Sequence, residues 1–188
     1  NSRAVLGILN LEEIQGLLLR VPALIDQLER RDANFVRDVK HWLLALEQVL
    51  VGNRMAIAGS VAALRGMLNS AELGVIPQGV AFHGRPTARQ IRDSTASDVL
   101  RRVSDLVSEA VRVDSLRIAE ANMLAHQLVV LAKSNGAVPA DPPAMNRARR
   151  LQEIWKALSA NPNTAPGAVR LASMLRQSDV AIVLDRSI

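Results

Sequence analysis

Residues 24–68 read LIDQLERRDANFVRDVKHWLLALEQVLVGNRMAIAGSVAALRGML, and the pattern of apolar residues in this stretch decides the fold class. Large apolar side chains recur every seven residues, which places them on one helical face: Leu28, Phe35, Trp42 and Val49, with Ile25, Val39 and Leu46 beside them. Gly52 and Asn53 interrupt the run, as a helix end and a turn do. A second apolar line follows at Ile57, Val61, Leu64 and Leu68. The stretch predicts an antiparallel helical hairpin on which the rest of the chain packs.

The remaining chain shows helical periodicity as well. The expected helices cover residues 3–20, as one helix or two short ones, and residues 23–51, 54–71, 96–133, 144–160 and 164–177. Residues 32–34 favour a local break inside the second of these helices, because Asp and Asn compete for backbone hydrogen bonds. Thr95 and Asp98 form a capping box that would start the fourth helix. Residues 180–184 fit a helix or a strand, and helix is favoured because a lone strand would have no partner.

These elements predict an all-α chain, an antiparallel bundle of four to five main helices with a helical C-terminal appendage. Pro139, Pro142 and Pro143 mark a linker between the two parts. The expected division is a bundle at 1–136, a Pro-rich linker at 137–143 and an appendage at 144–188. About 45 residues are too few to form a large core of their own, so we expect the appendage to dock on the bundle.

The composition limits the classes of function. The chain of 188 residues has no Cys, which excludes disulfides and thiolate metal sites and fits a cytoplasmic protein. No uninterrupted apolar run reaches the roughly 18–20 residues that a membrane span needs, so we expect no membrane partner. The net charge of +5 is modest and dispersed. Such a basic excess suits weak attraction of anions and not a dedicated nucleic-acid clamp.

No local motif of catalysis or cofactor binding stands out. The three His, His41, His83 and His126, lie in separate elements and lack the four-residue spacing of a helical zinc site. The chain also lacks a Gly-x-Ser-x-Gly elbow, a P-loop and a Gly-x-Gly-x-x-Gly run. We therefore predict no metal and no cofactor. An enzyme whose site assembles only in three dimensions is the third interpretation, with His83, Arg85 and His126 as its candidates.

A stripe of small residues runs along the expected helix 54–71. Its members are spaced three and four apart and are our candidates for a protein interface: Ala56, Gly59, Ala63, Gly66 and Ser70. Each interior glycine costs about 1 kcal/mol relative to alanine, so a compensating interaction is expected. Close packing between helices of the same chain is the favoured explanation, and a dimer interface on the stripe is the alternative.

Two arginine clusters are candidates for binding anions or nucleic acid. The first contains Arg85, Arg89 and Arg92, which would share a face if the segment is helical, and the second contains Arg147, Arg149 and Arg150. Arginine grips phosphates and carboxylates with two parallel hydrogen bonds. A solvated surface with internal ion pairs is the simpler reading. No aromatic residues interleave either cluster, which disfavours a platform that stacks single-stranded bases.

We therefore predict a non-enzymatic helical protein-interaction or assembly module that self-associates or binds a protein partner. The alternative is an accessory nucleic-acid-binding subunit that uses the arginines at 85–92 and 147–150. Binding that weakens steeply with salt would favour the alternative, because contacts to phosphates release counterions.

Overall fold

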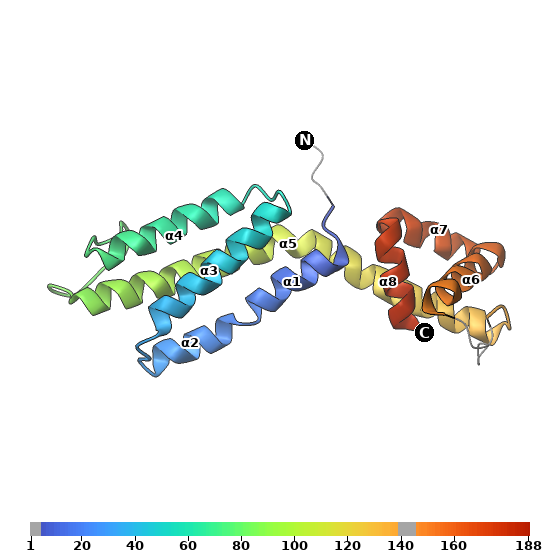
Figure 1. Ribbon diagram of the computed structural model, residues 1–188, viewed down its shortest axis with the longest axis horizontal. Coiled ribbons are helices and arrows are strands. Elements are labelled where there is room, and N and C mark those ends of the chain that lie inside the picture. Colours follow the sequence, from blue (N-terminus) through green and yellow to red (C-terminus); the bar gives the residue numbers. More distant parts are fainter. Residues whose placement is uncertain (1–4, 139–145) are drawn as a thin grey trace. The chain divides into compact units, whose positions relative to one another are not determined.

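The computed structural model describes residues 5–138 and 146–188, and all regular secondary structure in these ranges is helical (Figure 1). The predicted all-α class is therefore confirmed. The helices are α1 (Ile8–Leu18), α2 (Val21–Glu29), α3 (Phe35–Gly52), α4 (Ala58–Glu72), α5 (Ala88–Ser134), α6 (Arg147–Ala160), α7 (Ala165–Met174) and α8 (Gln177–Ser187). They form two compact units: unit 1 ends at Arg112 and unit 2 begins at Val113, so α5 contributes to both.

Helix α3 is at the centre of unit 1. It packs against α1, α2 and α4, and Figure 1 shows it between α4 and the α1–α2 pair. Its buried face carries Phe35, Val39, Trp42, Leu43, Leu46 and Leu50. Trp42 Nε1 donates a hydrogen bond to the carbonyl oxygen of Leu17 at 2.7 Å, which satisfies the one polar atom of that side chain. The repeat in residues 24–68 thus marks the α3 face that forms the core.

Residues 30–34 separate α2 from α3, as the sequence predicts. The Asp32 carboxylate accepts a hydrogen bond from the backbone N–H of Asn34 at 2.8 Å, which is a local turn that competes with the helix. Arg31 has a φ of 54°, in the left-handed region. One predicted core position of α2 is wrong: Ile25 is 44% exposed, and its neighbour Leu24 is buried instead.

Helix α5 begins seven residues before the predicted capping box at Thr95, which is fully buried inside the helix. The actual cap is Thr87 with Gln90. The Thr87 backbone N–H donates to Gln90 Oε1 at 2.8 Å, and the Gln90 backbone N–H donates to Thr87 Oγ1 at 3.2 Å. This is the reciprocal bonding of a capping box. The helix therefore begins within the segment 85–92, which the sequence allows but does not require to be helical.

Unit 2 consists of the second half of α5 together with α6, α7 and α8, which pack against one another. Arg117 Nη1 donates to the carbonyl oxygen of Met174 at 2.7 Å, and Arg170 pairs with Glu120, so α7 is tied to α5. A Cβ at Gly167 would overlap Leu128 of α5, so glycine allows α7 to approach α5 closely. Residues 180–184 lie in α8, as the favoured helical interpretation predicts.

The second half of α5 buries only part of the apolar stripe that helical periodicity predicts for residues 96–133, which includes Val113, Leu116, Met123 and Leu128. Val113, Leu116 and Met123 are expected in the core, but they are 57%, 61% and 65% exposed. The buried apolar positions are Ile118, Ala121, Ala125, Leu128, Val129 and Ala132. Helical periodicity likewise predicts Val169 in the buried face of residues 164–177, but it is 71% exposed on α7. These predictions are wrong because periodicity finds an apolar stripe but not the stripe that neighbouring helices cover.

The division between the compact units also differs from the predicted bundle boundary at 136. It falls inside α5, because residues 113–134 pack with α6, α7 and α8. The Pro-rich linker at 137–143 lies mostly outside the described residues. The assignment of domains, and the docking of the C-terminal helices on the bundle, stay predictions. In the described ranges no helix combines the length and apolarity that crossing a bilayer requires.

Candidate interaction surfaces

The small-residue stripe of α4 faces away from the rest of unit 1. All five members, Ala56, Gly59, Ala63, Gly66 and Ser70, are exposed. A Cβ added at Gly59 or Gly66 would meet nothing beyond its own helix within 4 Å. The favoured explanation, close packing between helices of the same chain, is therefore wrong. No other helix of unit 1 covers the stripe.

Two ion pairs fix this orientation of α4 on α3. Arg65 Nε lies 2.8 Å from Glu47 Oε2, and Lys40 Nζ lies 2.6 Å from Glu72 Oε2. The hydrogen bond to Glu47 raises the pKa of Arg65, which favours the protonated, positively charged form of Arg65. Both pairs join α4 to α3, which leaves the small residues on another face.

A hollow of about 770 Å³ adjoins the stripe between α4 and α5. Its lining is Ser60, Ala63, Leu64, Met67, Arg102, Asp105 and Leu106. Ala63 belongs to both the stripe and the hollow. The charged residues at the hollow are paired, because Arg102 contacts Asp98 at 3.4 Å and Asp105 contacts Arg101 at 3.7 Å. The hollow therefore offers mainly an apolar contact area.

Unit 2 contains an apolar cavity of about 510 Å³, the α6–α8 cavity, among α6, α7 and α8. Its lining is Ala148, Leu151, Gln152, Trp155, Ala172, Leu175, Gln177, Val180, Ala181 and Leu184. The polar residues among these are Gln152 and Gln177, and both are exposed at the surface. A cavity of this size with few polar groups is typical of a binding pocket.

A second hollow, the Arg150 hollow, lies between α6 and α8 and measures about 480 Å³. It is lined by Arg147, Arg150, Leu151, Asp185 and Ile188. Arg147 forms an ion pair with Asp185, and its hydrogen bonds lower the pKa of Asp185 and raise that of Arg147. The Nε of Arg150 is buried and has no hydrogen-bond partner in the described structure.

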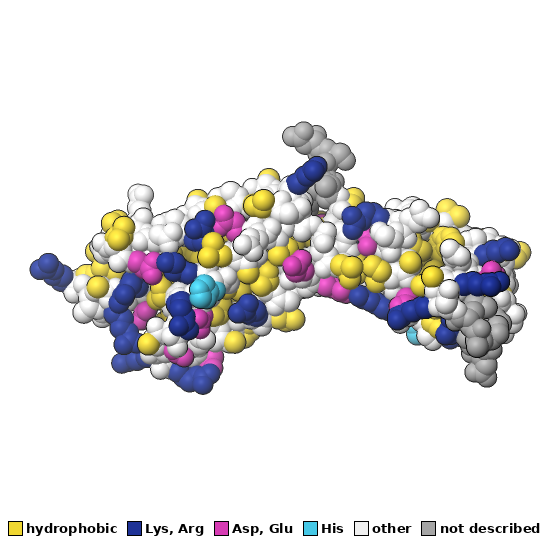
Figure 2. All heavy atoms as spheres, viewed as in Figure 1, with side chains coloured by type: hydrophobic (Ala, Val, Ile, Leu, Met, Phe, Trp, Pro, Cys, Tyr) yellow, Lys and Arg dark blue, Asp and Glu magenta, His cyan; other side chains and the backbone are white. Residues whose placement is uncertain are grey.

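The first arginine cluster spans the start of α5 in unit 1: Arg85 precedes the helix, and Arg89 and Arg92 lie in it. Arg89 contacts Asp93 at 3.4 Å and donates to the carbonyl oxygen of Arg31 at 2.9 Å, so it is engaged within the chain. Arg85 and Arg92 are exposed. On the face drawn in Figure 2, basic and acidic side chains are interspersed over this part of the molecule. The simpler reading, a solvated surface with internal ion pairs, fits Arg89.

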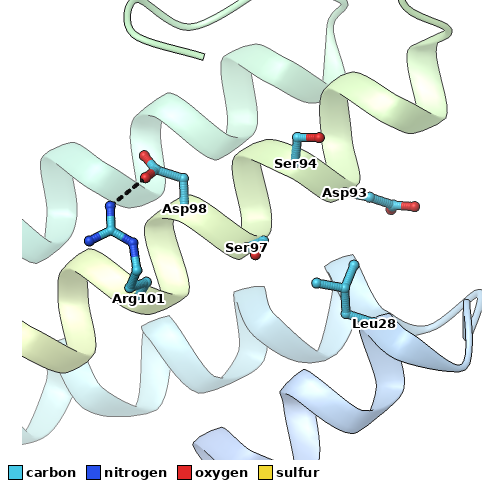
Figure 3. A pocket seen from close by; sticks show the side chains of 6 residues that line it. All are labelled: Leu28, Asp93, Ser94, Ser97, Asp98 and Arg101. Carbon is cyan, nitrogen blue, oxygen red and sulfur yellow. Dashed lines mark hydrogen bonds and ion pairs between the residues drawn. The ribbon is translucent and has the colours of Figure 1, made fainter. Parts of the chain in front are cut away.

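A polar hollow of about 380 Å³ lies between α2 and α5 (Figure 3). In Figure 3, Leu28 projects from α2, and the α5 residues Asp93, Ser94, Ser97, Asp98 and Arg101 complete the lining. Asp98 already pairs with Arg101 at 3.0 Å. The acidic groups of this hollow are thus occupied, and they do not form a pair of free carboxylates for acid–base chemistry. Across the described ranges, no cluster of three or more His, Asp or Glu could hold a metal ion.

The candidates of the enzyme interpretation do not line any of the four hollows described above. His83 and Arg85 lie in the segment between α4 and α5 of unit 1, and His126 lies on α5 in unit 2. All three side chains are exposed, as is His41. The geometry of the hollows therefore gives the enzyme interpretation no support.

The α6–α8 cavity was missed by the sequence analysis. The sequence signal for it is the apolar periodicity of residues 144–160, which predicts Ala148, Leu151 and Trp155 on the inward face. All three line the cavity, and Trp155 is half-buried there. Helix α8 supplies Val180, Ala181 and Leu184, from the segment whose secondary structure was ambiguous in the sequence.

Comparisons with protein-family models, with curated proteins and with solved structures returned no significant match. The surfaces described above are therefore the basis for a functional assignment.

Proposed function

We propose that this chain is a non-enzymatic helical interaction module that binds a protein partner in the α6–α8 cavity. The observation that carries the proposal is an apolar cavity of about 510 Å³ with Trp155 in its wall. Binding energy at protein interfaces concentrates in a few anchor side chains that fill such pockets. Gln152 and Gln177 lie at the rim, where they could bond to the backbone or to polar side chains of the partner.

The proposal is tested by closing the cavity with a charge. Ala181 is exposed at the cavity, so Ala181→Glu should place a carboxylate in its mouth without disturbing the core. Val169→Glu, on an exposed position of α7 outside the cavity, is the matched control. We expect proteins captured from the source cells by the wild type and by Val169→Glu to be depleted at least tenfold with Ala181→Glu, measured by quantitative mass spectrometry.

Two results would contradict the proposal. The same proteins could bind equally to all three chains, which would place the interface elsewhere. The wild type could also capture nothing above a tag-only control. Circular dichroism of both variants must match the wild type for the comparison to hold.

Assembly is the second part of the proposal, with self-association through the α4 stripe and the hollow beside it. Small residues permit close approach of two backbones, and the exposed stripe has no covering element within unit 1. Leu64, Met67 and Leu106 of the adjoining hollow would add apolar area to such a contact.

We also propose the finer architecture: an antiparallel bundle of four to five main helices that carries the C-terminal helices as an appendage. The contacts of α3 with α1, α2 and α4 support the bundle. The hollows that α5 lines together with α2 and with α4 support a position of its first half in the same bundle.

The alternative function is an accessory nucleic-acid-binding subunit. Arg85, just before α5, and Arg92, in its first turns, favour it, because both are exposed and neither forms an ion pair with a described residue. Titration of duplex and single-stranded DNA at low salt and at about 200 mM salt should give a steep loss of affinity if phosphates are contacted. Absence of binding at low salt would exclude this alternative.

A further inference from the structure

The two hollows of unit 2 adjoin each other, and they differ in character. The α6–α8 cavity is apolar, whereas the Arg150 hollow is lined mainly by charged side chains. Leu151 lines both, so the hollows follow each other along α6. A ligand that fills the apolar cavity can therefore reach Arg150 at the same time.

Arg150 is suited to accept an anionic group from such a ligand. Its Nε is buried without a hydrogen-bond partner, and a buried donor in this state is unfavourable until an acceptor reaches it. Arg147, the other arginine of the hollow, is already paired with Asp185. A carboxylate can accept two parallel hydrogen bonds from one guanidinium, which strengthens the contact and fixes its orientation.

Further positive charge lies along the rim of the α6–α8 cavity. Arg149 and Lys156 come three residues before and four residues after Gln152 of the cavity lining, so the three share one side of α6. Both are exposed, and neither forms an ion pair with a described residue. Glu153 is the single acidic residue of α6, against four basic ones. The α6 side of the rim is therefore positive.

We infer that the α6–α8 cavity receives the apolar side of an acidic amphipathic helix from a partner protein, with one of its carboxylates on Arg150. This inference rests on the proposed function and adds the chemistry of the partner. A helix with apolar residues three and four apart can place one side chain in the cavity and acidic residues on either side of it. Charge complementarity with Arg149, Arg150 and Lys156 selects an acidic partner over a neutral or basic one.

The test uses three synthetic helical peptides of 16 residues with the full chain. The acidic peptide has Leu and Phe on one face and Glu on both flanks. The second peptide carries Lys in place of each Glu, and the third carries Ala in place of Leu and Phe. Trp155 at the cavity should report binding by fluorescence, whereas Trp42 is fully buried in unit 1 and should stay silent. Calorimetry gives the dissociation constants.

We expect the acidic peptide to bind at least tenfold more tightly than either control peptide, with an affinity that falls as salt rises. Two variants should each weaken binding of the acidic peptide about tenfold: Arg150→Gln, and the double variant Arg149→Gln with Lys156→Gln. Arg170→Gln is the matched control, because Arg170 is an exposed arginine of unit 2 outside both hollows. Arg150→Lys keeps the charge but removes the two-donor geometry, so it should give an intermediate loss.

Other outcomes distinguish a failure of this inference from a failure of the proposed function. Equal binding of the acidic and lysine peptides, with a change in Trp155 fluorescence, would overturn the inference that the partner is acidic. The proposal that the cavity binds a protein partner would stand. Failure of all three peptides to bind would overturn both. A 12-nucleotide oligothymidine could bind the chain and displace the acidic peptide, and Arg150→Gln could abolish both the binding and the displacement. That result would overturn the inference in favour of nucleic acid.

Discussion

The Arg147–Asp185 ion pair joins the first turn of α6 to the last turn of α8. Hydrogen bonds from Arg147 are the main cause that lowers the pKa of Asp185, and the charges of Arg186 and Arg150 act in the same direction. A carboxyl whose pKa is lower in the folded chain than in the unfolded chain stabilises the fold while it is ionised. Its contribution is present above the unfolded pKa, about 4, and is lost as the pH falls through the folded value.

We therefore expect Asp185→Asn to lower the melting temperature near pH 6, and the difference from the wild type to shrink below about pH 4. Thermal melts followed by circular dichroism between pH 6 and pH 2.5 measure this. Asp105→Asn is the control, because the Asp105 side chain is 73% exposed and lies 3.7 Å from Arg101. A difference between wild type and Asp185→Asn that stays constant over this range would show that the charge of Asp185 does not stabilise the fold.

At the scale of the element, α4 combines an exposed face with two interior glycines. Because a Cβ at Gly66 has free space, Gly66→Ala should raise the free energy of unfolding by about 0.5–1 kcal/mol through its higher helix propensity. The corresponding rise in melting temperature is about 1–4 °C for a chain of this size. Gly167→Ala is the contrasting variant and should destabilise, because its Cβ would overlap the buried Leu128.

The same helix decides whether the chain assembles through the stripe. The double variant Gly59→Leu with Gly66→Leu should reduce self-association, measured by sedimentation velocity over a range of concentrations. The thermal melt of the dilute variant should stay cooperative. If Gly66→Ala instead lowered the stability of the dilute protein, the prediction that the stripe is exposed would be wrong. The stripe would then have to pack inside the fold.

At the scale of the whole molecule, unit 2 should fold without unit 1. Its core contains fully buried residues of α6, α7 and α8, such as Leu158, Leu171 and Val183, together with Ala125 and Val129 of α5. We expect residues 113–188 alone to be helical and to melt cooperatively, as seen by circular dichroism and calorimetry.

A shorter fragment, residues 137–188, tests the predicted boundary directly. It keeps α6, α7 and α8 but loses the α5 face that covers them, including Ala121, Ala125 and Val129. It should therefore lose most of its helicity. Cooperative folding of the shorter fragment would instead favour the boundary that the sequence predicts at residue 136.

Much of the fold follows from local signals in the chain. The apolar repeat of α3, with Phe35, Trp42 and Leu46 on one line, depends only on 3.6-residue geometry and is visible in the sequence. The break before α3 depends on Asp32 and Asn34, whose side chains bond to the nearby backbone. The start of α5 was misplaced although its cap is local, because Thr87–Gln90 and Thr95–Asp98 are both plausible caps in the sequence.

Tertiary packing alone decided which apolar faces became core and where the binding surfaces lie. Val113, Leu116 and Met123 of α5 look as suitable for burial as Ile118 or Val129, and only the positions of α6, α7 and α8 select between the two faces. The α4 stripe and the α6–α8 cavity have the same origin. By itself, the sequence determined an all-helical chain and the buried line of its central helix, because periodicity is a property of one helix. Exposed faces and cavities are relations between helices, so they required the folded structure.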